Sequence, residues 1–393
     1  MALDPNLLAQ LQGVHPARRM PLDALRAGLM QGAAEKRINI SRDGDLELFN
    51  YSSLCQFEQQ WDLFALIARG LILDPARRQV VATPFPKFFN FNEGGVALPD
   101  ESFTVSEKFD GSLGILFYHH DKWRITTRGQ LSSAQGAWAT RHLHDTVDIS
   151  RLSAGTTYLV EIVYKENKVV IPYDFEGLVL LAAYDPSGRE LARSDLEQTA
   201  FAVGMRLAAS VAFSTFDDLL NAAGRLTIHE EGYVLRFDGG LRVKLKGEAY
   251  CRVHKLICHC TPLALWESMM HAEDLDSRRH ELPEEMRVDF DSIRRLLSAQ
   301  FDALVDEVRV GHERTTGRND KELGMILQDP NRDLTAMQGK FVFACRKGKF
   351  LDAVHAKGPW REKLFKCMRP DGNRLKGYVA SSAMNRFAES SES

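Results

Sequence analysis

The chain has 393 residues, of which 44% are hydrophobic and 26% are charged, and its formal net charge is −3. This composition is ordinary for a globular protein and excludes the fibrous and largely disordered classes. Because the net charge is slightly negative, any site for a polyanion must be built from local clusters of basic residues.

The chain shows no pattern of secretion or of membrane insertion. Residues 1–30 mix charged and apolar residues and do not resemble a secretion signal. The longest uncharged apolar stretch, Gly177–Tyr184, is too short to cross a bilayer. The six cysteines are few and unevenly spaced, as in proteins of a reducing compartment. We therefore expect a cytoplasmic protein.

One group of cysteines and histidines falls within ten residues: Cys251, His254, Cys258, His259 and Cys260. A zinc site usually has two short pairs of ligands separated by a loop, whereas these residues form one continuous segment. We interpret them as small buried thiols on a helix.

The first 250 residues predict mainly strands. Three pairs of β-type segments are each separated by a short turn, within Ala68–Phe85, Ser112–Gly129 and Gly232–Gly247. Such pairs predict hairpins and therefore antiparallel sheets. Among the helices expected between them, one has Ser194 and Glu197 at the spacing of a capping box, which predicts that the helix begins there.

From about Thr261 the apolar residues recur at intervals of three and four, as in amphipathic helices. This period predicts helices within 262–275, 286–308 and 333–348. We therefore predict an α+β protein with two domains: antiparallel sheets with flanking helices over residues 1–253, and a mainly α-helical C-terminal domain over residues 254–393.

The helical part is divided by charge. Residues 267–307 contain 12 Asp and Glu against 5 Arg, whereas residues 340–380 contain 11 Lys and Arg against 3 Asp and Glu. The basic segment is a candidate for contact with nucleic-acid phosphates, and a solvated helix face is the alternative. Asp289 and Asp291 are expected on a solvated face.

Lys108 lies in the otherwise strand-like segment Glu107–Ile115. Burying an unpaired ammonium group is costly, so a lysine here is either at an exposed edge or kept for chemistry. The motif Lys-x-Asp-Gly is weak evidence alone, and Arg369–Gly372 resembles it without strands to follow.

More polar residues interrupt later strand-like segments. Glu161, the pair Glu230 and Glu231, and the pair Lys244 and Lys246 all lie within apolar or β-branched runs. Lys244 and Lys246 are two residues apart, so both project from one face of a strand. Each residue alone is compatible with a solvated face, but the whole series in this order favours a site.

The series suits a nucleotide. Lysines on one strand face supply fixed positive charge for a triphosphate, and carboxylates on neighbouring strands hold Mg²⁺ or hydrogen-bond a ribose. Neighbouring cations and partial burial are expected to lower the pKa of Lys108 from about 10.4 toward neutrality, which would make the amine a nucleophile.

The same residues resemble the motifs of the covalent nucleotidyltransferases, the superfamily of ATP-dependent ligases and capping enzymes. The matching positions are Lys108-Phe109-Asp110-Gly111, Glu161, Glu231-Gly232 and Lys244-Leu245-Lys246. Upstream, Arg69 and the run Lys87–Asn90 resemble segments of the phage RNA ligase 1 branch. The resemblance covers roughly residues 65–250, and it implies a nucleotidyltransferase fold for the first domain.

The resemblance implies a role for each matching position. Lys108 would attack the α-phosphorus of ATP to form lysyl-AMP, and Lys244 and Lys246 would neutralise the α-phosphate. Glu231 and Glu161 would hold Mg²⁺ or Mn²⁺, directly or through water. The positions implied to contact ATP or AMP are Arg69, Lys87, Phe89, Asp110, Gly111, Arg128, Glu161, Glu231, Val234 and Tyr250.

The sequence departs from the family pattern at two places. Arg128 stands where many relatives have lysine, so the charge is kept with a different geometry. The helical C-terminal region shows no match to the family. The aromatic run Phe88, Phe89 and Phe91 is able to stack bases, but such a run is more often core.

The implied activity is ATP-dependent joining of RNA 5′-phosphate and 3′-hydroxyl ends through lysyl-AMP, in repair of single-stranded RNA or cleaved tRNA. The alternatives are an ATP-dependent DNA ligase, a capping guanylyltransferase, and a non-catalytic RNA-binding protein of the same fold. The first two normally have a β-barrel domain after the last lysine motif, whereas this sequence is helical there, which favours RNA ligase.

Overall fold

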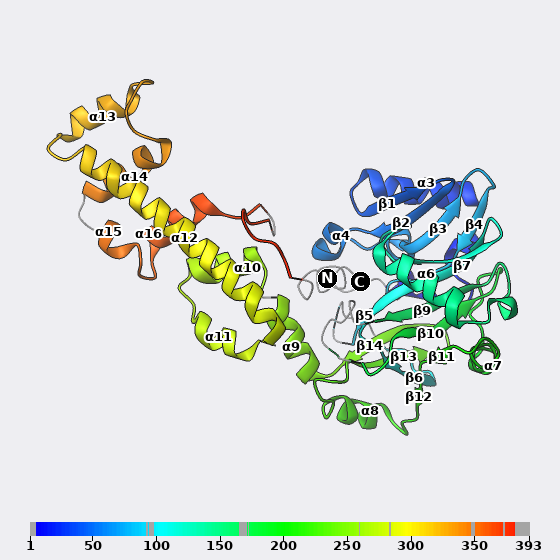
Figure 1. Cartoon of the computed structure of the whole chain (residues 1–393). Helices are drawn as coiled ribbons and strands as arrows, with labels where there is room; N and C mark the ends of the chain where they lie inside the picture. The colour runs from blue at the N-terminus through cyan, green and yellow to red at the C-terminus, as the bar shows by residue number, and fades with distance from the viewer. Residues whose placement is uncertain are drawn as a thin grey trace. The chain divides into compact units, whose positions relative to one another are not determined.

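The computed structural model describes residues 5–381, except for 92, 94–97, 165–170, 172, 259, 283, 347–349 and 372–373. The chain divides into two compact units, one up to Arg252 and one from Val253 onward (Figure 1). The first unit carries all the sheets that the structure describes, and the second consists mainly of helices.

The first sheet is antiparallel and has the strand order β1-β2-β3-β4. Its strands are β1 (Ile38–Asp43), β2 (Leu46–Tyr51), β3 (Arg69–Asp74) and β4 (Gln79–Ala82). Helix α3 (Leu22–Ala34) buries Leu25 and Leu29 against this sheet. Short helices complete this region: α1 (Pro5–Ala9), α2 (Pro16–Arg19), α4 (Ser53–Glu58) and α5 (Leu63–Ile67).

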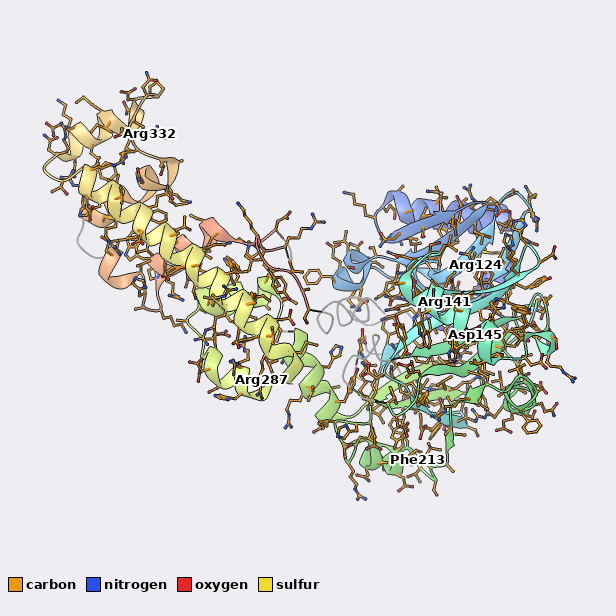
Figure 2. The ribbon with its side chains drawn as sticks, viewed as in Figure 1. Arg124, Arg141, Asp145, Phe213, Arg287 and Arg332 are labelled. Carbon is orange, nitrogen blue, oxygen red and sulfur yellow. The ribbon has the colours of Figure 1, made fainter. Side chains whose placement is uncertain are left out.

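The second sheet has the order β11-β10-β9-β7-β8. Its strands are β7 (Ser112–His119), β8 (Lys122–Thr127), β9 (Thr157–Val163), β10 (Gly177–Tyr184) and β11 (Arg206–Leu207). Buried residues of α6 (Ala134–Thr146) and α7 (Arg193–Val203) share one apolar cluster with it, and η1 (Ile149–Arg151) lies between these helices in the chain. The charged residues Arg141 and Asp145 project from the exposed side of α6 (Figure 2).

The third sheet has the order β12-β6-β13-β14-β5. Its strands are β5 (Phe89–Asn90), β6 (Phe103–Lys108), β12 (Ser210–Val211), β13 (Gly232–Phe237) and β14 (Arg242–Lys246), and α8 (Phe216–Ala223) packs on its apolar residues. The chain passes from the third sheet to the second at Phe109–Gly111, directly after Lys108.

The second unit is organised around the long helix α12 (Glu284–Arg314), whose 31 residues span about 46 Å. Phe290, Ile293, Leu297 and Phe301 recur at three- and four-residue intervals and are buried. The other helices of this unit are α10 (Pro262–Met270), α11 (Leu275–Glu281), α13 (Asp320–Gln328), α14 (Ala336–Arg346), α15 (Phe350–Ala353), α16 (Pro359–Phe365) and η3 (Lys366–Met368). Arg287, labelled on α12 in Figure 2, donates to the Leu282 carbonyl at 3.1 Å.

The predicted α+β class is confirmed, with mainly antiparallel sheets in the first unit and helices in the second. The three predicted hairpins are confirmed as β3–β4, β7–β8 and β13–β14. Only the short edge strands β5 and β11 pair in parallel among the described strands. In these residues no helix is both long and apolar enough to span a membrane.

Three local predictions are wrong. Helix α7 begins at Arg193 without a side-chain cap, because Glu197 accepts from Arg193 instead of closing a capping box. Asp289 is buried rather than solvated, and it accepts hydrogen bonds from the Tyr378 hydroxyl at 2.8 Å and from Ser381. Cys260 is buried as expected, but Cys251, on α9 (Glu248–Cys258), is exposed. His259 lies outside the described residues.

Gly232 is required by the close approach of β13 to β14. Its φ is +147°, and a Cβ atom there would lie 2.1 Å from the Leu245 carbonyl oxygen and 2.8 Å from Lys246 Cα. These contacts are with backbone, so a side chain at position 232 has to displace β14.

We predict that Gly232→Ala destabilises the first unit by about 2–4 kcal/mol, because it combines backbone strain with a steric clash. Denaturant unfolding would measure the loss. The matched control is Gly324→Ala on α13, where nothing lies within 4 Å of the added Cβ. Equal stability of the two variants would contradict the role assigned to Gly232.

Candidate active site

The three predicted site lysines lie on one face of the third sheet. Lys108 on β6 is opposite Gly232 on β13, which is opposite Lys246 on β14. Two residues after Gly232 on β13, Val234 is opposite Lys244 on β14. Residues opposite one another in an antiparallel sheet project to the same side, as do residues two apart. The sheet register therefore brings Lys108, Lys244 and Lys246 together.

Glu231 joins two of these lysines. Lys108 Nζ donates to Glu231 Oε2 at 2.6 Å, and Lys246 Nζ lies 2.9 Å from Glu231 Oε1. Glu231 is only 3% exposed. Burial would raise its pKa, but the two ammonium groups outweigh burial and lower it. Both oxygens of this buried carboxylate are thus engaged by site lysines.

The predicted lowering of the Lys108 pKa is wrong for the ligand-free protein. Burial acts to lower this pKa, but the carboxylates of Glu231 and Glu161 outweigh it, and the net shift is upward. The sequence prediction considered the neighbouring cations, whereas the direct partner of the ammonium group is an acid. The amine is therefore protonated at rest.

The lysine whose pKa is lowered is Lys244. Burial has the largest effect, followed by repulsion from Arg69, Lys108, Lys87 and Lys246, and together they lower the pKa well below its ordinary value. Among the described residues no carboxylate lies within ion-pair distance of its Nζ atom, which is instead 4.9 Å from the centre of the Phe88 ring.

Arg69, at the start of β3, and Lys87, before β5, add two more buried cations. Arg69 is 7% exposed, and its Nη1 atom is buried without a hydrogen-bond partner in the described structure. Lys87 Nζ lies 5.0–5.4 Å from the ring centres of Tyr51, Trp61 and Phe89. Burial lowers the pKa of both cations. The site therefore holds positive charge that its own acids do not balance.

The aromatic residues at this site differ in part from those predicted. Phe89 is buried, with its ring 5.5 Å from that of Trp61, so it packs under Lys87. Phe88 is half-buried, and Arg69 Cζ lies 5.0 Å from its ring centre. Trp61 was missed by the sequence reasoning, because no motif marks it.

Arg128, just after β8, is buried at the same site. Its guanidinium donates to the Tyr51 hydroxyl and lies 4.9 Å from the Tyr51 ring centre. Tyr51 is the last residue of β2 and was also missed, because it belongs to the first sheet and far precedes the motifs. Burial would raise the Tyr51 pKa, but Arg128, Lys87 and Arg69 lower it.

Asp110 and Gly111 shape the turn after Lys108. Asp110 Oδ1 accepts from the Tyr250 hydroxyl at 2.9 Å, and Oδ2 accepts from the Ile171 amide at 2.9 Å. Its own amide donates to the Tyr173 hydroxyl at 2.7 Å. A Cβ on Gly111 would lie 2.5 Å from the Ile162 carbonyl oxygen. These two residues hold the loop to β9 and α9, and the interactions given for the Asp110 carboxylate are structural.

Glu161 projects from β9 near this turn. Burial raises its pKa to about 7, and Glu231 and Asp110 act in the same direction, while Lys108 and Arg69 oppose the rise. Glu161 is half-buried, and the loss of hydration outweighs the attraction of Lys108 and Arg69, so a divalent cation beside this carboxylate would stabilise its charged form. Glu231 fits less well, because a metal ion would have to replace one of its lysines.

The raised pKa of Glu161 predicts a pH-dependent stability. The folded protein holds this proton between about pH 4.5 and 7, whereas the unfolded chain has lost it, so stability is highest at low pH and falls as pH rises through this range. Relative to Glu161→Gln, the wild-type chain should lose on the order of 2–3 kcal/mol between pH 5 and 8. Denaturant unfolding of both proteins measures this, and a constant difference between them would contradict the assignment.

The sequence model of a family described as RNA ligase matches residues 67–250, just under half of the chain. An RNA ligase of Rhodothermus phage RM378 is 21% identical over 366 residues, which cover 73% of this chain and 83% of that protein. A putative bifunctional polynucleotide kinase/RNA ligase of Autographa californica nuclear polyhedrosis virus is 25% identical over 246 residues. That match covers 54% of this chain and about a third (34%) of the viral protein.

Among solved structures, an archaeal ATP-dependent RNA ligase aligns with a TM-score of 0.47 at 12% identity, over 84% of this chain and 99% of that one. The segment that the family model matches, residues 67–250, contains the Lys108 motif, Glu161, Glu231 and the Lys244 pair. Over part of its length the chain is therefore similar to RNA ligases, among them RNA ligase 1 of bacteriophage TS2126, which is 30% identical over 131 residues that cover 29% of this chain and 33% of that protein.

Proposed function

We propose that this protein is an ATP-dependent RNA ligase that joins a 5′-phosphate to a 3′-hydroxyl end through a lysyl-AMP intermediate. The observation that carries the proposal is the shared contact of Lys108 and Lys246 with the buried Glu231, at a site that also holds the buried cations Arg69 and Lys87. The sequence relatives named RNA ligases support the choice of RNA.

The excess of buried positive charge is the reason to assign a polyphosphate substrate. The pKa is lowered for Arg69, Lys87 and Lys244, which means that the charged form of each side chain is destabilised. A bound triphosphate would stabilise all three positive charges. Arg69 and Lys87 would hold the β- and γ-phosphates, with the unpartnered Nη1 of Arg69 as one donor. Lys244 and Lys246 would neutralise the α-phosphate.

In the first step Lys108 must leave Glu231 and lose a proton to expose its lone pair. Glu231 is the acceptor in direct contact, at 2.6 Å. Lys108 Nζ then forms a bond to the α-phosphorus of ATP, the bond to the bridging oxygen breaks, and pyrophosphate leaves. An oxygen of the RNA 5′-phosphate next attacks this phosphorus and releases the lysine. Finally a 3′-hydroxyl attacks the RNA phosphorus and AMP leaves.

Glu161 would hold Mg²⁺ or Mn²⁺ directly or through water. Glu231 would do so once a lysine has left it. The bound ion would offset negative charge that develops on phosphorus. The adenine would lie between Val234, which is half-buried on the lysine face of the sheet, and an apolar residue of β10. Asp110, Gly111 and Tyr250 would act by positioning the Lys108 turn.

We predict that Lys108→Ala abolishes transfer of AMP from α-labelled ATP to the protein, because it removes the nucleophile. Lys246→Ala should slow this transfer by about 100-fold or more, because it removes fixed charge at phosphorus. Lys122→Ala, at an exposed position on β8, is the matched control and should label normally. Normal labelling of the Lys246 variant would contradict its role.

The competing activities are separated by substrate. An RNA ligase labels with ATP rather than GTP and joins RNA ends, whereas an all-DNA nick would be the better substrate of a DNA ligase. A panel of 5′-phosphorylated single-stranded RNA, nicked duplexes and cleaved anticodon stem-loops distinguishes these. A protein that binds RNA but never becomes labelled would leave only the non-catalytic alternative.

We propose that residues 1–253 carry adenylylation and that residues 254–393 contact RNA. Part of the basic segment is already used for packing: Arg361 Cζ lies 5.0 and 4.7 Å from the ring centres of Phe301 and Phe365, which stack on one another. Its guanidinium also donates to the Met269 carbonyl, and burial lowers its pKa. Among the described residues of this segment, the exposed basic ones are Lys340, Arg346, Lys357, Lys363, Lys366, Arg369, Arg374 and Lys376.

We predict that Lys357→Glu, Lys366→Glu and Lys376→Glu combined weaken RNA binding at least about tenfold at low salt and flatten its salt dependence, because fewer phosphate contacts remain. Self-adenylylation should be unchanged. The control carries the same charge change at three exposed basic residues of the first unit, as Lys36→Glu, Lys122→Glu and Arg225→Glu. Equal weakening in both triple variants would show a general charge effect and overturn the assignment.

A further inference from the structure

A second cluster of polar side chains lies at the other end of β7 from the Lys108 turn. His119 is the last residue of β7, and His120 follows it in the turn to β8. Seven residue steps separate His119 from Ser112, the start of this strand, which corresponds to about 20–25 Å. The cluster therefore belongs to neither the nucleotide site nor its supporting residues.

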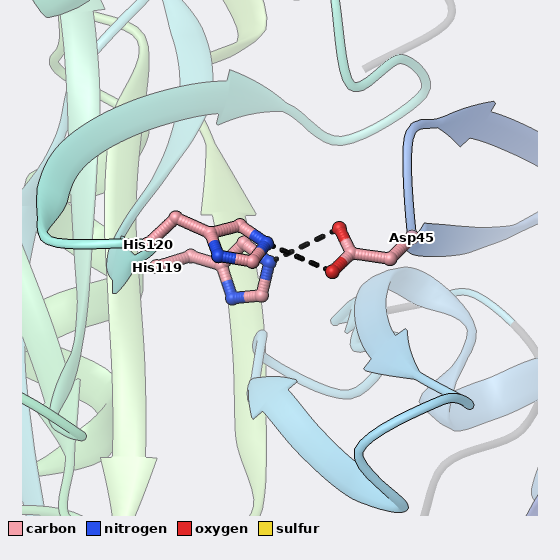
Figure 3. A group of neighbouring side chains, drawn as sticks. All are labelled: Asp45, His119 and His120. Carbon is pink, nitrogen blue, oxygen red and sulfur yellow. Dashed lines mark hydrogen bonds and ion pairs between the residues drawn. The ribbon is translucent and has the colours of Figure 1, made fainter.

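Both histidines face Asp45, which lies in the turn between β1 and β2 (Figure 3). His119 Nε2 is 3.3 Å from Asp45 Oδ1, and His120 Nε2 is 2.8 Å from Asp45 Oδ2. One ligand atom from each residue lies within 4.8 Å of the others. Two imidazoles and a carboxylate are a common donor set for divalent transition-metal ions, with metal–ligand distances of about 2.0–2.2 Å.

Asp74 supplies an independent observation that points to a ligand. This last residue of β3 is fully buried (0% exposed), and its Oδ2 atom has no hydrogen-bond partner in the described structure. The atom lies 3.9 Å from His119 Nε2 and 3.8 Å from Arg77 Nε, beyond hydrogen-bond distance. An unsatisfied buried carboxylate oxygen is costly, and a cation beside His119 would satisfy it.

Arg77 competes with a metal ion in the metal-free protein. Its Nη2 atom is 3.1 Å from His120 Nδ1, and because guanidinium only donates, Nδ1 must accept and Nε2 carries the proton. Binding of a metal at Nε2 moves that proton to Nδ1, so Arg77 has to leave. Its side chain is 52% exposed, which leaves it free to move into solvent.

We infer that Asp45, His119 and His120, with Asp74 as a fourth ligand, form a binding site for a divalent transition-metal ion of the zinc class. The ion links the β1–β2 turn of the first sheet to the β7–β8 turn of the second sheet. The site is structural and does not depend on the activity proposed above.

Titration calorimetry of the full-length, chelator-treated chain with Zn²⁺, in the absence of nucleotide, tests this inference. The wild-type chain should show a stoichiometric site that is weakened at least about tenfold by Asp45→Asn or His120→Ala, since even loss of an outer-sphere partner costs that much. Co²⁺ should give a visible absorption band in the wild-type chain that both variants lose.

Two further variants test whether a change in Zn²⁺ binding is specific to the proposed ligands. His229→Ala removes an exposed histidine elsewhere and should bind Zn²⁺ as the wild type does. Arg77→Ala removes the competing cation and should bind at least as tightly as the wild type. Absence of a stoichiometric site in the wild type, or equal binding by the wild-type, Asp45→Asn and His120→Ala chains, would overturn the inference.

Discussion

The shared contact of Lys108 and Lys246 with Glu231 is the interaction on which the rest of the site depends. Three lysines project from one face of a sheet, where burial and mutual repulsion both oppose their charge. One buried carboxylate offsets two of them and fixes their positions through direct ion pairs. Lys244 receives no such partner among the described residues, and burial, followed by repulsion from the neighbouring cations, lowers its pKa.

This arrangement separates the residues that carry charge from those that hold the backbone. Asp110 is implied by its motif to contact the nucleotide, yet its carboxylate oxygens accept from the Tyr250 hydroxyl and the Ile171 amide. Gly111 and Gly232 allow backbone segments to approach more closely than any side chain permits. The motif residues beside Lys108 and Glu231 therefore act by placing the two charged groups within 2.6 Å of each other.

Much of this could be predicted from the sequence, because alternation of apolar residues and turn signals are local properties. The β13–β14 hairpin and the common face of Lys244 and Lys246 follow from a period of two. Partners that are distant in the chain could not be predicted: Tyr51 and Trp61 contact Lys87 from other elements, and Asp289 is buried by residues that follow it by about 90 positions. The predicted direction of the Lys108 pKa shift is wrong for the same reason, because the direction depends on which charged group lies nearest in the folded chain.

Because the pKa of Lys108 is raised, its ion pair with Glu231 has to break before the amine can react. A protonated amine held by Glu231 is not a nucleophile, so the lysine is unreactive until its ion pair is broken. In the proposed reaction, a polyphosphate bound beside Arg69, Lys87 and Lys244 would relieve their repulsion, and that gain in free energy would offset the cost of separating Lys108 from Glu231. The same positive charge would thus favour substrate binding and make activation of the lysine depend on it.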